Sequence, residues 1–126
     1  EYFWITSGLD LVNAELKETS TPLPRIPPLR ARVGLDLRYG RFSFVPEITM
    51  AARQNRIFPT ETETAGYAVV NLKASYTFPR THFVHHLAFE VFNVGDVLYR
   101  NHVSFIKDLA PEIGRGVRFS YAVKFF

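Results

Sequence analysis

The stretch that most restricts the fold is residues 31–53, ARVGLDLRYGRFSFVPEITMAAR, in which apolar and polar side chains alternate. Odd positions up to Tyr39 are apolar, even positions are mostly polar or small, and the parity reverses from Phe42 onward. Successive side chains of a β-strand point to opposite faces, whereas an amphipathic helix repeats about every 3.6 residues. The segment therefore predicts two strands, each with one apolar and one polar face.

A two-residue turn at Gly40-Arg41 would join these strands with like faces together. Gly40 can supply the positive φ that a type II′ turn requires. Pro46 has no N–H group for the ladder, so it predicts a bulge or an unpaired position. The expected partners are Tyr39 with Phe42, Leu37 with Phe44, Val33 with Ile48 and Ala31 with Met50 on the apolar face, and Arg38 with Ser43, Gly34 with Glu47 and Arg32 with Thr49 on the polar face.

Four further segments alternate in the same way and predict strands within residues 2–17 and at 67–78, 84–95 and 117–125. A loop at 79–82 would join the second and third of these. The expected partners across that loop are Phe78 with Phe83, Tyr76 with His85, Ala74 with Leu87 and Leu72 with Phe89. The predicted fold class is all-β, an antiparallel up-and-down meander of about six strands.

The connections between the predicted strands alternate in length. They are short at 40–41 and 79–82, and long at 18–28, 55–66 and 96–114. A sandwich has little reason to sort its loops in this way, whereas membrane barrels have short periplasmic turns and long outer loops. The pattern therefore favours a segment of a large transmembrane β-barrel.

Alternation alone leaves the environment of the apolar face open. In a small soluble β-barrel or sandwich that binds an apolar ligand this face would be the core, and in a membrane barrel it would contact lipid. The apolar stretches are about nine residues long, enough to cross a bilayer when tilted. The chain stops inside a strand on Phe125-Phe126, and aromatic side chains suited to interfacial girdles mark the strand ends at Tyr39, Phe42, Tyr76, Phe78, Tyr121 and Phe125.

Composition disfavours several classes of protein and site. The chain has no cysteine, so it offers neither a disulfide nor a thiolate metal ligand. Its 15 Lys and Arg against 12 Asp and Glu form no basic block, which disfavours nucleic-acid binding. No apolar run approaches the ~20 residues of a transmembrane helix, and EYFWITSGLDL does not read as a signal peptide. The chain begins in what resembles the middle of a strand, which indicates a fragment.

Three runs closely resemble the C-terminal end of TonB-dependent outer-membrane receptors: LPRIPPLRARVGLDLRY (23–39), RQNRIFPTETETAGYAVVNLKASYTF (53–78) and FEVFNVGDVLYRNHVSFIKDLAPEIGRGVRFSYAVKFF (89–126). Their shared motifs are P-x-x-P before a strand, E-T-x-T-x-G-Y at a strand start, N-x-x-D-x-x-Y after a strand, G-R before the last strand and a terminal Phe. The resemblance implies that residues 1–126 belong to a barrel of about 22 strands, with the plug domain absent from this chain.

The resemblance further implies a transport receptor without enzymatic activity, located in the bacterial outer membrane. Such a receptor would take up a scarce substrate, such as a metal ion or a metal chelate (zinc or a ferric siderophore), with TonB-coupled energy and no cofactor of its own. Its implied partners are outer-membrane lipid, its own plug and through it TonB, and the barrel-assembly machinery. That machinery would read the last strand, through Phe119, Tyr121, Val123, Phe125 and Phe126, although Phe126 lies one place beyond the outward alternation. The long loops would then face outward.

One long loop carries candidate metal ligands. His102, Asp108 and Glu112 combine an imidazole with two carboxylates, which could hold zinc or another divalent ion, and the surrounding N-H-x-S-F-x-K-D wording is similar to a metal-uptake branch of the family. The alternative is that they are solvated or loop-folding residues. A hydrolytic set of His102, Ser104 and Asp108 is disfavoured, because three residues on one loop give no oriented base and nucleophile.

Other charged residues have structural and functional interpretations. His85 and His86, near a short turn, are expected to be interfacial or packing residues, and Glu61 and Glu63 to be exposed carboxylates rather than loop ligands. The predicted polar face would line a wet lumen, contact the plug and guide substrate, or form a cross-strand charge ladder. Its charged members are Arg30, Arg32, Asp36, Arg38, Glu47, Arg53, Lys73, Glu90, Arg118 and Lys124.

Overall fold

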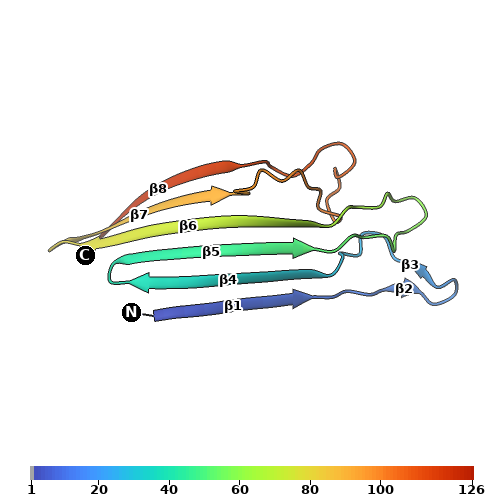
Figure 1. Ribbon diagram of the computed structural model, residues 1–126, viewed down its shortest axis with the longest axis horizontal. Coiled ribbons are helices and arrows are strands. Elements are labelled where there is room, and N and C mark those ends of the chain that lie inside the picture. The colour runs from blue at the N-terminus through green and yellow to red at the C-terminus, as the bar shows by residue number, and fades with distance from the viewer. Residues whose placement is uncertain (1) are drawn as a thin grey trace.

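The computed structural model describes residues 2–126 and is built on one antiparallel sheet (Figure 1). Its six strands, in spatial order, are β1 (Tyr2–Asp10), β4 (Arg30–Tyr39), β5 (Phe42–Ala51), β6 (Tyr67–Pro79), β7 (Phe83–Phe92) and β8 (Gly116–Phe125). The short strands β2 (Glu15–Leu16) and β3 (Thr21–Pro22) form a separate hairpin. The predicted all-β meander of about six strands is confirmed.

The β4–β5 hairpin follows the predicted register. All seven expected pairs are present, from Tyr39 opposite Phe42 to Ala31 opposite Met50. Gly40 has a φ of 58°, as a type II′ turn requires. Pro46 pairs with Leu72 of β6 but has no partner in β4, and the register is unchanged on either side, so it is an unpaired position and not a bulge.

The β6–β7 hairpin differs from the prediction by two residues. Phe78 lies opposite His85 and Ala74 opposite Phe89, where the sequence predicted Phe83 and Leu87. The reason is a tighter turn: Arg80 N donates to Phe83 O (2.6 Å) and Phe83 N to Arg80 O (3.4 Å), which leaves only Thr81 and His82 in the loop. Because the shift is even, every side chain keeps its predicted face.

The sheet is a single layer, and strand contacts in the described chain join only neighbours within a sheet. The apolar face is uncovered: Leu35 is 37% exposed, Leu37 39% and Phe89 48%. Among the strand residues of the 2–126 segment the buried apolar side chains are Ala51, Val69 and Ala88, and the register places all three on the polar face. The core that a soluble barrel or sandwich would need is therefore not formed by this part of the chain.

The short turns lie at one end of the sheet and the long connections at the other, as their lengths predicted. Figure 1 shows the β4–β5 and β6–β7 turns at one end of the sheet, with the β2–β3 hairpin and the loops after β5 and β7 at the other. The 2–126 segment contains no helix long and apolar enough to cross a membrane. The long-loop end is where segments distant in the sequence come into contact.

Candidate functional site

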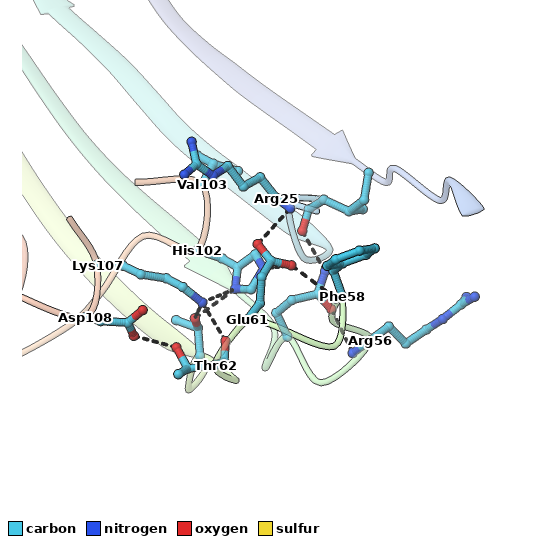
Figure 2. Close-up of polar contacts among 12 residues, drawn as sticks. Arg25, Arg56, Phe58, Glu61, Thr62, His102, Val103, Lys107 and Asp108 are labelled. Carbon is cyan, nitrogen blue, oxygen red and sulfur yellow. Dashed lines mark hydrogen bonds and ion pairs between the residues drawn. The ribbon is translucent and has the colours of Figure 1, made fainter. Parts of the chain in front are cut away.

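The loop end of the sheet holds a polar cluster with a buried centre, made by three connections (Figure 2). We call the contacting residues Arg25, Glu61, Thr62, Thr64, His102 and Lys107 the loop cluster. Arg25 comes from the β3–β4 connection, Glu61 to Thr64 from the β5–β6 loop, and His102 and Lys107 from the β7–β8 loop. His102 is 2% exposed and Lys107 6%, which is unusual for polar residues on surface loops.

The Lys107 ammonium lies among three acceptors. Its Nζ donates to the Thr62 carbonyl oxygen, to Thr64 Oγ1 (3.4 Å) and to His102 Nδ1 (3.3 Å). Thr64 Oγ1 also lies 2.8 Å from His102 Nδ1. A buried ammonium is tolerated only when such acceptors replace its water, so the cluster is built around this cation.

The other ring nitrogen of His102 faces a carboxylate. Because an ammonium can only donate, Nδ1 is the acceptor and the ring proton is assigned to Nε2. Nε2 is buried without a hydrogen-bond partner in the described chain, 4.0 Å from Glu61 Oε2. Glu61 instead accepts from the backbone N–H groups of Arg25 (2.9 Å) and Phe58 (3.2 Å), so its carboxylate ties two connections together.

The pKa of His102 lies below its ordinary value of 6.5, chiefly because burial disfavours the charged ring. The neighbouring Lys107 ammonium lowers the pKa further, while Glu61 and Asp108 act in the opposite direction. The cluster is therefore electrically arranged for a neutral imidazole beside a lysine cation. This arrangement opposes a second positive charge at the same place.

The predicted metal ligands are not gathered into one site. His102 Nδ1 is used by Thr64 and Lys107, Asp108 hydrogen-bonds the hydroxyl of Thr62, and Glu112 is held through its backbone N–H by Tyr99 O (2.9 Å). Within the described residues no group of three or more His, Asp and Glu is arranged to hold a metal ion. The Lys107 ammonium, and not a metal-type group of side chains, contacts the acceptors at the centre of the loop cluster.

The two glutamates of the β5–β6 loop also correct the sequence interpretation. Glu61 was expected to be an exposed carboxylate, but its side chain is only 12% exposed and anchors the loop. Glu63 is exposed and forms an ion pair with Arg53. The two side chains therefore serve separate partners instead of repelling one another.

The N-x-x-D and G-R motifs of the β7–β8 loop hold the two ends of the loop together. Asn93, at a φ of 47°, accepts from Val97 N (2.8 Å) and donates to Val97 O (2.9 Å), while its own N–H donates to Asn71 Oδ1 (3.0 Å). Asp96 Oδ1 accepts from Arg115 N (2.7 Å). A Cβ at Gly114 would lie 2.9 Å from that same oxygen, so the glycine allows the two ends of the loop to meet.

The charged side chains of the polar face pair across strands. Glu90 of β7 lies between Lys73 of β6 (3.0 Å) and Arg118 of β8 (3.4 Å). Further cross-strand pairs join Arg32 to Glu47 (3.9 Å) and Arg30 to Asp10 (3.6 Å), whereas Arg38 pairs with Asp36 of its own strand β4 (2.7 Å). The predicted charge ladder is therefore present, except that Arg53 lies beyond the end of β5 and that no ion pair of Lys124 is found among residues 2–126.

Sequence reasoning missed several residues of the loop cluster. Lys107, Thr64 and Arg25 were not predicted as site residues, although Thr64 lies within the E-T-x-T-x-G-Y motif and Arg25 within P-x-x-P. Arg25 also places its guanidinium 3.3 Å from the ring centre of Phe105. The E-T-x-T-x-G-Y and P-x-x-P motifs were the sequence features that could have identified these residues, because each motif lies where one connection contacts another.

Comparisons with known proteins agree with this architecture. Residues 2–94 match the family described as TonB dependent receptor-like, beta-barrel. A search of curated proteins finds no significant match. Among solved structures, the chain is similar to one titled copper transporter OprC, with a TM-score of 0.82 and 26% identity over 98% of this chain and 21% of that chain. The chain therefore spans about a fifth of that transporter, and it belongs to the TonB-dependent receptor β-barrel family.

Proposed function

We propose that this chain is a membrane-spanning part of an outer-membrane receptor that takes up a metal ion or a metal chelate with TonB-coupled energy. The observation that carries the proposal is a single-layer sheet with an exposed apolar face and a charged opposite face, in a chain of this family. An apolar face that contacts acyl chains needs no second protein layer. The receptor class of the family also supports transport and not catalysis.

The substrate class rests on the similarity to a protein titled copper transporter. Zinc, copper and a ferric siderophore are therefore the first substrates to test. The loop cluster is not proposed as the metal site, since Lys107 already occupies it. Its role in this proposal is to hold three outer connections as one unit around the mouth of the barrel.

The polar face would line the hydrated interior of the complete barrel. Lys73 and Arg118 are paired with Glu90 but remain 51% and 64% exposed, so their remaining N–H groups could contact a plug domain or a passing charged substrate. The long loops would face the exterior and the short turns the periplasm, as in barrels with this loop asymmetry. The aromatic side chains of β8, with Phe126 after them, would be presented to the assembly machinery at the periplasmic end.

Uptake by the complete receptor tests the proposal directly. Cells lacking the receptor are complemented with its gene, and entry of radioactive zinc, copper and a ferric siderophore is measured with and without TonB. We expect at least one probe to enter only when receptor and TonB are both present. Entry that persists without TonB, or no gain for any metal probe in receptor-producing cells, would contradict the proposal.

A further inference from the structure

Within the six strands of the large sheet, as described for residues 2–126, His85 is the one His, Asp, Glu, Lys or Arg side chain that the register places on the apolar face. An ionisable group within an apolar belt costs free energy, which makes it a candidate for function. The imidazole is stacked on Phe78, with ring centres 4.6 Å apart and planes 11° apart. Its position in β7 is two residues from Phe83, where the strand begins at the short-turn end.

The hydroxyl of Tyr121 orients this ring. It lies 2.8 Å from His85 Nδ1, and the two rings are nearly parallel, with an interplanar angle of 13°. When the Tyr121 O–H donates to Nδ1, the neutral ring carries its proton on Nε2. Within the described chain the ring makes no other hydrogen bond, so the Nε2–H group can donate to a ligand beside the sheet.

The turn next to His85 is basic. Arg80 continues the alternation of Tyr76 and Phe78, so its register position is on the same face as His85. His82 lies in the same turn as Arg80, and Lys124 lies near the end of β8. Arg41 lies in the other short turn and is not part of this group. In the described chain no Asp or Glu occurs in these turns, and Asp36 of β4 is held by Arg38 at 2.7 Å. This end of the sheet therefore has unneutralised positive charge beside an aromatic belt.

We infer that Arg80 and His85 bind the phosphate of an anionic glycerophospholipid in the leaflet that meets the short turns. The Arg80 guanidinium and the His85 Nε2–H group supply donors, Tyr121 positions the ring, and Phe78, Phe83 and Phe125 lie against the acyl chains. Charge complementarity identifies the occupant, because a phosphodiester on two acyl chains matches a basic rim above an aromatic belt. The inference rests on the proposed membrane location.

Lipid binding to the purified complete receptor provides the test. The receptor is equilibrated with phosphatidylglycerol or phosphatidylcholine, and bound lipid is counted by native mass spectrometry. The variants are Arg80→Gln and His85→Phe, which keeps the stack on Phe78, and Arg41→Gln serves as a control that removes one charge from the neighbouring turn. Each variant is first checked for the heat-modifiable gel band of a folded barrel.

We expect phosphatidylglycerol affinity to fall about tenfold in each of the two site variants, as the loss of one charge-assisted hydrogen bond implies, and to change less than about twofold in the control. Phosphatidylcholine should bind equally weakly to all. Unchanged phosphatidylglycerol affinity in both site variants would overturn the inference, as would an equal loss in Arg41→Gln. Failure of the membrane assignment would appear separately, as absence of the receptor from the outer-membrane fraction of cells.

Discussion

The polarity of the sheet is tested most sharply by two adjacent small residues of β6. Ala74 lies on the apolar face between Phe44 and Phe89, and Ser75 lies on the polar face between Ser43 and Ala88. Both side chains are half-buried. Replacing either by arginine adds the same charge and nearly the same volume, so any difference between Ala74→Arg and Ser75→Arg reports on which face meets lipid.

The expected difference follows from the depth of Ala74. It lies five residues from Pro79, the end of β6 at the short turn, which is about 17 Å along the strand and about 12 Å along the membrane normal at a 45° tilt. The lipid-facing band of such barrels is about 25 Å tall, so Ala74 is close to the midplane. An arginine there costs about 2–4 kcal/mol, or about 30- to 700-fold in the folding equilibrium.

Urea titration of the complete receptor in lipid vesicles, followed by tryptophan fluorescence, measures this cost. We expect Ala74→Arg to lose the full amount and Ser75→Arg to stay within about 1 kcal/mol of the parent, because its arginine would reach a hydrated interior. A cost for Ser75→Arg equal to or larger than that for Ala74→Arg would refute the assignment of the apolar face to lipid.

Three predictions concern the loops. Protonation of His102 is disfavoured in the folded loop cluster, so loop stability should fall as pH drops below about 6.5 and stop falling below the lowered folded-state pKa. Limited proteolysis at pH 7.5 and 5.5 should show faster cleavage of the loops at the lower pH, and His102→Gln should remove this difference. Asn93→Ala leaves two backbone groups of Val97 unpaired, so hydrogen exchange at the base of the β7–β8 loop should accelerate about tenfold or more. Gly114→Ala should displace the Asp96 carboxylate and lower the unfolding midpoint, whereas Gly116→Ala, whose Cβ would meet Phe92 at 3.7 Å, should not; equal midpoints would contradict the close-approach role.

Side-chain periodicity was sufficient to predict the strands and their faces. The β4–β5 register could be read from residues 31–53 because Gly40 specified a two-residue turn and only one alignment put apolar side chains together. The β6–β7 register was wrong by two because Pro79 and Arg80 were assigned to the loop, although Pro79 pairs with Val84. Alternation determines which face of the sheet each side chain occupies. It does not distinguish two registers that differ by two residues, and that choice depends on the length of the turn.

The loop cluster could not be predicted in the same way because its contacts have no period. His102 and Lys107 meet Glu61 and Thr64 across about forty residues of sequence, and their approach depends on where the hairpins bring the loops. A histidine with nearby acids suggested a metal site, because nothing in the residue pattern indicated that Lys107 would contact His102. The contacts of His102 with Thr64 and Lys107 could be found only from the three-dimensional structure, and binding of a metal by His102, Asp108 and Glu112 stays a prediction.

The distribution of burial bears on the environment of the apolar face, which alternation left open, and it supports the proposed membrane location. In a water-soluble sheet the large apolar side chains are buried and the polar face is exposed, but here Phe89 is 48% exposed while Val69 and Ala88, on the opposite face, are 5% and 8% exposed. Val69 lies opposite Thr49, and Ala88 lies between Ser75 and Ser120, so these small buried apolar residues have polar cross-strand neighbours. A sheet that left its large apolar side chains to water would aggregate, so this face requires a partner of continuous apolar character. In the proposed receptor, the acyl region of the bilayer would supply that partner along the whole face.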